Sequence, residues 1–449
     1  MSRKAMFFQS KDTLSSFTEI LRSVQEYISN KYAVLISDNP NEQKKQIKAY
    51  IAKFIRDYGY SIEGMTEQEL VNKLYCEMAE FSFLTKYLFA NDIEEININS
   101  YKDIKITYSD GRIIPTKEKF NSPGHAIDVI RRLLHQSGMI LDNSQPVVRG
   151  HLSNKIRITV FGNGVIDPDK GIAVSIRIVN PRELKKEDFI KNKTATEEML
   201  DFLSICLRYG VSNCITGATS SGKTTLMSWI LSTVPKDKRI ITIENGTREF
   251  DLVKEDEEGN VINNVIHTVT RYSEDEKQNI DQEKLLEFAL TANPDVISVA
   301  EMKSAEAFAA QEAARTGHAL TTTTHANSCE ATYGRMVTLC KMRYDINDNT
   351  LYQLVTEAFP IVVFAKKLED NTRKIMEITE CVIHPKGKRE VRTLYRYKVK
   401  ENKIVDGKFV IAGEFEKVNN ISESLQKRLL ENGLPQDALK RFLKEGDNE

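Results

Sequence analysis

The sequence has few cysteines, and they are widely spaced. Its six cysteines are spread over 449 residues without any C-x-x-C pair. This spacing argues against a zinc site and against a disulfide framework, and it fits a reducing cytoplasm. The six are Cys76, Cys206, Cys214, Cys329, Cys340 and Cys381.

Long apolar runs and an excess of one charge are also missing. The longest apolar run, Phe359 to Ala365, is far shorter than the ~20 residues of a membrane-spanning helix. The N-terminus lacks the apolar core of a signal peptide, so we expect a protein that is neither secreted nor membrane-spanning. Lys and Arg number 63 against 64 Asp and Glu, so bulk charge does not indicate nucleic-acid or anionic-membrane binding.

What the sequence does contain is a glycine-rich loop in a specific context. Residues Gly217 to Thr225, GATSSGKTT, match G-x-x-x-x-G-K-[ST], follow the apolar pair Cys214-Ile215 and lead into a helix-forming run. This order of strand, loop and helix is the context of a P-loop, whose backbone N–H groups and helix N-terminus hold phosphate. The alternative is an ordinary helix-capping loop, but the pattern arises by chance in only about a few per cent of chains this long.

The P-loop pattern assigns roles to individual residues. Lys223 is expected to reach the β- and γ-phosphates of ATP, and Thr224 to ligate Mg²⁺. The residues expected to contact the nucleotide are Gly217, Thr219, Ser220, Ser221, Gly222, Lys223, Thr224 and Thr225.

The first 90 residues show helical periodicity. Apolar residues recur at helical spacing from Leu14 to Ile28 and from Ile47 to Tyr58. A third helix is expected from Thr66, where Glu69 completes a capping box, and its apolar face runs to Phe81. Such a region is a helical domain or a docking arm, and we favour packing of these faces against one another.

Between residues 91 and 180 the period changes to two, which predicts a small α/β domain. Strands are expected between Ile93 and Ile114, followed by a helix over Ile127 to His135. Two further alternating strands, Lys155 to Val160 and Ile172 to Ile178, carry Arg157 and Arg177 on their polar faces. The two arginines are either solvated surface residues or, if the strands pair, cations presented to a polyphosphate.

The stretch over residues 181–195 is predicted to be a linker, because a proline and a charged run follow the last strand. From residue 196 to 449, short apolar strands alternate with helices. This alternation predicts a mainly parallel sheet covered on both faces, with the ligand at the carboxyl ends of the strands. The overall fold class is therefore α/β.

Acidic residues follow two of these predicted strands. Glu301 comes directly after Val296 to Val299, where P-loop enzymes place a carboxylate near Mg²⁺ and the attacking water, and it is the first choice for catalysis. Glu244 and Glu249 follow the strand Ile240 to Ile243, and either could orient water or simply cap the loop.

Four motifs follow one another along the chain: the P-loop, Ile243 to Phe250, Asn293 to Glu301, and Thr316 to Ser328. In this order they resemble the Walker A, Asp, Walker B and His boxes of the secretion ATPase superfamily. That superfamily includes motors of type II and type IV secretion and of type IV and tight-adherence pili. The resemblance covers residues from Ile93 to the C-terminus and is closest to the CpaF-like branch.

The resemblance implies a RecA-like ATPase domain, preceded by a PAS-like domain, in a homo-hexameric ring that couples hydrolysis to domain rotation. It implies that Arg157, Arg177 and, less securely, Arg271 contact phosphate. It also implies that Glu249, Glu301, His318 and His325 are catalytic, the histidines acting around the γ-phosphate. The implied cofactors are ATP and Mg²⁺, and the implied partner is an inner-membrane platform protein. The implied location is cytoplasmic and peripheral to the membrane.

Several positions depart from the family pattern. Ser220 stands where glycine is usual, Asn245 replaces the Asp-box aspartate, and one extra residue lies between Glu244 and Glu249. Further departures are Ala300, Lys303 and Ser304 around Walker B, and His151 and Thr291 at positions usually held by arginine.

The sequence is compatible with three functions. The preferred one is an ATP-driven ring motor for pilus assembly, protein secretion or conjugative transfer. A DNA-translocating ATPase would need a basic channel, which a net charge of −1 does not indicate, so no direct nucleic-acid binding is expected. A nucleotide-gated assembly platform with little turnover would account for Asn245 and the other departures.

Overall fold

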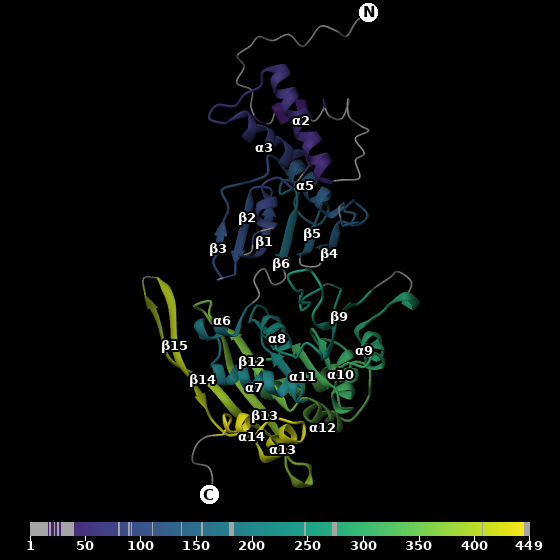
Figure 1. The fold of residues 1–449 in the computed structure, drawn as a ribbon, viewed down its shortest axis with the longest axis vertical. Coiled ribbons are helices and arrows are strands. Elements are labelled where there is room, and N and C mark those ends of the chain that lie inside the picture. Colours follow the sequence, from purple (N-terminus) through teal and green to yellow (C-terminus); the bar gives the residue numbers. More distant parts are fainter. Residues whose placement is uncertain are drawn as a thin grey trace, which may run out of the picture. The chain divides into compact units, whose positions relative to one another are not determined.

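The computed structural model describes residues 40–443, apart from 80, 89, 91, 110, 136, 154–155, 179–183, 247, 272–275 and 406, together with a few positions between 17 and 27. Its contacts divide the chain into two compact units. The first comprises residues 1–152 and 158–178, and the second comprises residues 153–157 and 179–449. Figure 1 shows the elements of both units.

The first unit opens with helices whose apolar faces pack together. Helix α2 spans Pro40–Tyr58, α3 spans Glu67–Ala79 and α4 spans Leu84–Leu88. Ile51, Leu74 and Ile20 belong to one buried cluster, which confirms that these faces pack against one another. The helix predicted over Leu14 to Ile28 lies mostly outside the described residues.

The capping box predicted at Thr66 is present. The Thr66 backbone N–H donates to Glu69 Oε2 at 2.8 Å, and the Glu69 N–H donates to Thr66 Oγ1 at 3.3 Å. The helix nevertheless ends before Phe81, because α3 stops at Ala79 and Ser82 has a φ of 57°. Phe81 is instead buried in the turn that leads to α4.

A six-stranded sheet and one helix complete the first unit. The strand order is β3-β2-β1-β6-β5-β4, so the two strands that carry Arg157 and Arg177 are neighbours. Their polar faces are as predicted, since residues on either side of each arginine in the strand are buried. The elements are β1 Ile93–Ser100, β2 Asp103–Tyr108, β3 Ile113–Pro115, α5 Pro123–His135, β4 Val147–Ser153, β5 Ile156–Phe161 and β6 Ala173–Ile178.

The second unit is built on a nine-stranded sheet of order β15-β14-β13-β12-β7-β11-β10-β8-β9. Neighbours from β12 to β9 are parallel, whereas β13, β14 and β15 add on as antiparallel strands. The strands are β7 Asn213–Thr216, β8 Arg239–Glu244, β9 Asn264–Val269, β10 Val296–Val299, β11 Ala319–Thr324, β12 Ile361–Lys367, β13 Arg373–Ile383, β14 Arg389–Val405 and β15 Lys408–Lys417.

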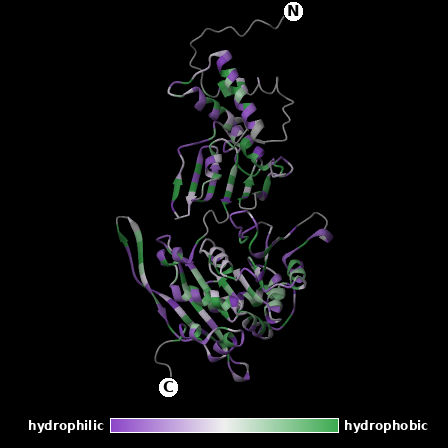
Figure 2. Cartoon of the chain, in the orientation of Figure 1, coloured by the Kyte–Doolittle hydropathy of each residue, from purple (hydrophilic) through white to green (hydrophobic). Residues whose placement is uncertain are grey.

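Helices cover both faces of this sheet, as predicted for an α/β domain. Successive residues of β10, Val296 and Ile297, belong to two different buried clusters, one on each face. Figure 2 shows the hydrophobic character of the central strands. The helices are α6 Lys186–Lys191, α7 Glu197–Arg208, α8 Lys223–Ser232, α9 Gln282–Thr291, α10 Glu306–Arg315, α11 Cys329–Lys341, α12 Asp348–Ala358, α13 Glu423–Glu431 and α14 Gln436–Lys440.

No helix in the described part of the chain is both long enough and apolar enough to cross a bilayer. Helix α6 lies inside the stretch predicted as a linker. Its Phe189 is buried and lies 5.6 Å from the Trp229 ring of α8, measured between centroids. The linker stretch is therefore structured where it enters the second unit.

Candidate functional site

The glycine-rich loop joins β7 to α8 and requires glycine at two positions. Gly217 has a φ of 146°, and a Cβ there would lie 2.0 Å from the carbonyl oxygen of Ala365. Gly222 has a φ of 92° and is the residue at which α8 begins. Any side chain at Gly217 would push the loop off β12, so the sequence pattern follows directly from the backbone geometry.

The loop presents donors that its own residues do not satisfy. The Ser221 hydroxyl oxygen is buried and has no hydrogen-bond partner among the described residues. The N-terminus of α8 lies directly after it, with N–H groups that a helix cannot satisfy internally. A buried hydroxyl beside a helix N-terminus fits an anionic, oxygen-rich ligand such as phosphate.

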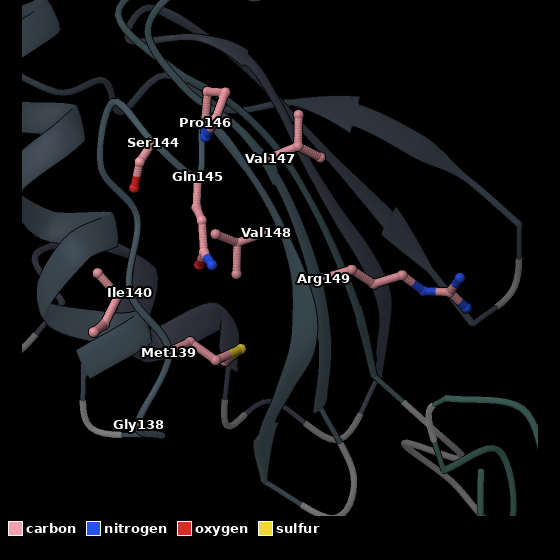
Figure 3. A pocket seen from close by; sticks show the side chains of 9 residues that line it. All are labelled: Gly138, Met139, Ile140, Ser144, Gln145, Pro146, Val147, Val148 and Arg149. Atoms are coloured by element: carbon pink, nitrogen blue, oxygen red, sulfur yellow. The ribbon is translucent and has the colours of Figure 1, made fainter. Parts of the chain in front are cut away.

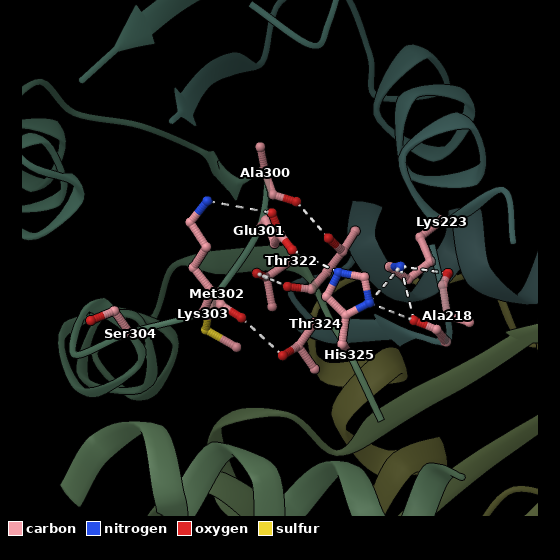
Figure 4. Close-up of polar contacts among 12 residues, drawn as sticks. Ala218, Lys223, Ala300, Glu301, Met302, Lys303, Ser304, Thr322, Thr324 and His325 are labelled. Atoms are coloured by element: carbon pink, nitrogen blue, oxygen red, sulfur yellow. Dashed lines mark hydrogen bonds and ion pairs between the residues drawn. The ribbon is translucent and has the colours of Figure 1, made fainter. Parts of the chain in front are cut away.

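Lys223 is the buried cation of this loop. Its Nζ donates to the carbonyl oxygens of Gly217 at 2.9 Å and Ala218 at 3.0 Å. The same Nζ lies 3.4 Å from His325 Nδ1 (Figure 4). The ammonium is therefore held at the mouth of the loop by carbonyls, which a phosphate could replace as acceptors.

His325 links Lys223 to Glu301. His325 Nδ1 lies 3.0 Å from the Gly217 carbonyl oxygen, and its Nε2 lies 2.8 Å from Glu301 Oε1. The other carboxylate oxygen of Glu301 lies 3.8 Å from Lys303 Nζ. Nδ1 thus faces both the Gly217 carbonyl oxygen and the Lys223 ammonium, whereas Nε2 faces the Glu301 carboxylate.

These residues meet because their strands are neighbours and parallel. β10 pairs with β11, and β11 pairs with β7. Glu301 follows β10, His325 follows β11, and the phosphate loop follows β7. Side chains beyond the carboxyl ends of adjacent parallel strands lie together, which is the position expected for a ligand site in such a sheet.

Glu244 has a structural role that settles one open alternative. Its carboxylate is fully buried and accepts hydrogen bonds from the backbone N–H groups of Glu249 and of Phe250, the latter at 3.1 Å. It also accepts from the Thr242 hydroxyl at 2.7 Å. Glu244 therefore caps the loop that carries Glu249, and its oxygens are already occupied.

His267 of β9 completes this buried group. The Leu252 N–H lies 3.3 Å from His267 Nε2, so Nε2 is the acceptor and Nδ1 carries the proton. His267 Nδ1 lies 3.1 Å from Glu244 Oε1. Sequence reasoning missed His267, because its only signal is its partner on the neighbouring strand.

Asn245, at the Asp-box position, is bound within the same loop. The Thr270 hydroxyl donates to Asn245 Oδ1 at 3.3 Å and accepts from the Gly246 N–H at 2.8 Å. An uncharged amide oxygen is sufficient for this contact.

The His-box resemblance places both His318 and His325 around the γ-phosphate. In the structure the two histidines lie apart. His318 precedes β11 and His325 follows it. Six residues at roughly 3.3 Å each separate the two ends of that strand by about 20 Å. His318 Nδ1 lies 3.3 Å from the Pro294 carbonyl oxygen, at the opposite end of the sheet from the phosphate loop.

The three predicted arginines differ in their surroundings. Arg157 belongs by contacts to the second unit, and its Nη1 lies 3.7 Å from Glu249 Oε1. Arg177 is exposed on β6, opposite Glu95 of β1. Arg271 is exposed and pairs through its backbone with Ile280.

A surface hollow of about 660 Å³ lies in the first unit, apart from the residues of the phosphate loop (Figure 3). None of its lining residues belongs to the group around Lys223. The hollow is lined by Gly138, Met139, Ile140, Ser144, Gln145, Pro146, Val147, Val148 and Arg149.

No group of three or more His, Cys, Asp or Glu side chains among the described residues could hold a metal ion. Such a cage is not needed for Mg²⁺, which uses one or two protein ligands together with phosphate oxygens and water. A hydroxyl is a ligand of this kind, and Thr224 carries one in the first turn of α8. The residues present therefore fit Mg²⁺ that arrives with a nucleotide.

Several known proteins are similar to this chain. MJ0900 of Methanocaldococcus jannaschii, an uncharacterized protein, is 28% identical over 234 residues, which are 52% of this chain and 41% of that protein. Conjugal transfer protein TrbB of Rhizobium radiobacter is 25% identical over 276 residues, which are 60% of this chain and 76% of TrbB. The Yersinia pseudotuberculosis ATPase DotB aligns with 81% of this chain and 84% of its own, at 14% identity and a TM-score of 0.48.

The match to a family is broader. Residues 165–435, more than half of the chain, match the family described as "Type II/IV secretion system protein". The matched range contains the phosphate loop, Glu301 and His325. The chain belongs to the type II/IV secretion system protein family.

Proposed function

We propose that the protein hydrolyses ATP with the loop after β7 and the acidic and basic residues beyond β10 and β11. The observation that supports this most strongly is the continuous polar chain from Lys223 through His325 to Glu301. It places a cation at the phosphate loop and a carboxylate beside it. Phosphoryl transfer to water needs both groups.

The binding roles follow from the loop geometry. Lys223 exchanges its carbonyl partners for the β- and γ-phosphate oxygens, and the Ser221 hydroxyl donates to phosphate. Mg²⁺, held by Thr224, would neutralise charge on the phosphates. We further propose that Arg157, Arg177 and Arg271 supply the remaining positive charge.

The catalytic roles fall to Glu301, Glu249 and His325. Glu301 accepts a proton from the attacking water as general base, and His325 holds its carboxylate in place. Glu249 is positioned by Glu244 and orients the water. His318 is left out of this chemistry because it lies at the other end of β11.

We also propose that hydrolysis drives a ring of six copies, close to the CpaF-like branch, at the cytoplasmic face of a membrane machine. The family description and the name of TrbB support a role in secretion or conjugation. The ring would work with an inner-membrane platform protein. Its mass, measured with and without a non-hydrolysable ATP analogue, should reach six chains in at least one condition; a strict monomer with ATPase activity would oppose the ring.

The test of the ATPase proposal uses two variants of the full chain. Lys223→Ala should lose hydrolysis and bind ATP more weakly, because it removes the cation that holds the phosphates. Glu301→Gln should keep binding but lose turnover, because the amide preserves shape without accepting a proton. Steady-state phosphate release and binding of a fluorescent ATP analogue measure both quantities.

Each outcome is informative. Wild-type turnover in Lys223→Ala would refute the assignment of the loop. Loss of binding in a folded Glu301→Gln variant would make Glu301 a binding residue. ATP binding without phosphate release in the parent protein would instead support a nucleotide-gated platform.

A further inference from the structure

The start of strand β13 contacts two functionally different parts of the second unit. Arg373, its first residue, reaches the phosphate loop: its Nε donates to the Ser220 carbonyl oxygen at 3.1 Å. Its Cδ would lie 3.2 Å from a Cβ built on Gly222. Arg373 therefore rests directly against the loop where we place phosphate.

Lys374, the next residue, holds the linker stretch. Its Nζ donates to the carbonyl oxygens of Lys193 at 2.7 Å and Asn192 at 3.3 Å, just beyond the end of α6. The next N–H, that of Ile375, donates to the Thr194 carbonyl oxygen at 2.9 Å. Three consecutive bonds thus fix residues 192–194 to β13.

The Lys374 contact is unusual for a purely structural bond. The side chain is buried at 4% exposure, and no carboxylate forms an ion pair with it among the described residues. Burial lowers the pKa of this ammonium, although Asp370 opposes the shift. The Lys374 ammonium contacts only carbonyls and the Tyr397 ring, whose centroid is 5.8 Å away. Burying this charged group costs more free energy than burying a neutral donor would.

The neighbouring strand β12 of the same hairpin also contacts the phosphate loop. Ala365 of β12, paired with Ile375, supplies the carbonyl that excludes a side chain at Gly217. The β12–β13 hairpin therefore contacts the phosphate loop through both of its strands. A shift of the loop cannot occur without moving this hairpin or breaking these contacts.

We propose that Arg373 and Lys374 are positioning residues that transmit nucleotide occupancy from the phosphate loop to residues 192–194. This inference rests on the proposed nucleotide site. Binding of phosphate rearranges the loop, Arg373 follows the Ser220 carbonyl, and Lys374 passes the displacement to the end of α6. The linker stretch thus senses the nucleotide through one strand end.

Hydrogen exchange of peptides covering residues 186–195 tests the proposal in the full chain. In the parent protein a saturating non-hydrolysable ATP analogue should change the exchange rate of this segment by about threefold or more. In Lys374→Met that change should disappear, while the affinity for the analogue stays within about threefold. Lys366→Met is the matched control, because Lys366 pairs with Lys374 across the hairpin but is exposed.

The result separates signalling from simple support. If Lys374 were only structural, Lys374→Met would raise the exchange rate of residues 186–195 equally with and without the analogue. The ratio of the two exchange rates would then equal that of the parent protein, which would overturn the proposal. Arg373→Gln should also abolish the change in exchange rate that the analogue causes. The double variant should show no further effect, because the proposal places both residues in the same chain of contacts. Independent, additive effects would overturn it as well.

Two further outcomes distinguish this proposal from the one on which it rests. If the parent binds the analogue but the segment does not respond, the coupling is wrong and the nucleotide site stands. If the parent does not bind the analogue, both are wrong. Should Lys374→Met fail to fold, Lys374→Arg, which keeps the charge and the donors, must retain part of the response; loss of all response in that folded variant would overturn the proposal.

Discussion

At the scale of single residues, Ser220 carries backbone strain inside the phosphate loop. Its φ is 62°, and a left-handed conformation costs a residue other than glycine about 1 kcal/mol. Ser220→Gly should therefore raise the free energy of unfolding by about 0.5–1 kcal/mol. Urea unfolding followed by circular dichroism measures this quantity.

Thr219→Gly is the matched control for Ser220→Gly. Thr219 precedes Ser220 in the same loop and is exposed, but its φ is not positive. Glycine there chiefly adds freedom to the unfolded chain, so the free energy of unfolding should fall by about 0.5–1 kcal/mol. Equal stabilisation by both substitutions would contradict the assignment of strain to Ser220.

Single residues also show how far sequence predicts a site. Lys223 and Glu301 could be placed because each sits at a fixed distance along the chain from a strand. His267 and Arg373 could not, because their partners, Glu244 and Ser220, lie on other elements and only the folded sheet brings them together. His318 shows a related limit: its box is continuous in sequence, but the intervening strand β11 separates its ends.

At the scale of elements, the buried serine Ser422 joins the start of α13 to β13. Its hydroxyl oxygen accepts from the Leu425 N–H at 3.2 Å and caps the helix. Its backbone N–H donates to Glu380 Oε2 at 2.9 Å, and its hydroxyl donates to Glu380 Oε1. Burial raises the pKa of Glu380, while these donors from Ser422 oppose the shift.

Ser422→Ala should lower the free energy of unfolding by about 2–3 kcal/mol, because it removes a helix cap and a donor to a buried carboxyl group. Ser328→Ala is the matched control. Ser328 caps α11 through the Ala331 N–H at 3.0 Å without contacting a buried carboxyl group, so about 1 kcal/mol is expected. Equal losses in urea unfolding would show that the bond to Glu380 contributes nothing.

The elements of the second unit differ in how well their patterns predict them. The parallel strands β8, β10 and β11 are buried on both faces; β8 and β10 appear as short apolar runs and β11 as a run of β-branched threonines, so they could be identified. Strand β14 is long, but its C-terminal half is exposed and rich in lysine. Its pattern therefore lacks a buried face, and sequence gives little reason to extend the sheet by an antiparallel hairpin.

At the scale of the whole molecule, net charge and composition argue against some classes of function but do not identify one. A formal charge of −1 argues against non-specific binding of nucleic acid. It says nothing about where the positive charges lie, and a site for a polyphosphate needs only a few of them. Arg157 and Arg177, on adjacent strands of the first sheet, are positive charges whose placement the net charge does not reveal.

The last prediction tests whether these two arginines belong to the catalytic site. Their own strands give them no reason to affect hydrolysis, since both lie on polar faces of the first sheet. Cations that stabilise the transferring phosphoryl group as arginine fingers are worth roughly 10³ to 10⁵ in rate. Arg157→Ala and Arg177→Ala should therefore lower kcat strongly, and lysine should restore only part of it, because a point charge cannot reproduce the planar fork.

Arg112→Ala, which changes an arginine between β2 and β3 of the first unit, is the control and should hydrolyse ATP at the parental rate. Circular dichroism and the mass of the assembly separate lost chemistry from lost folding. The contact of Arg157 with Glu249 adds a second signature, because Arg157→Ala also frees a residue proposed to orient water. Its loss should therefore exceed that of Arg177→Ala. Parental rates in both alanine variants would make the arginines surface residues without a role in hydrolysis.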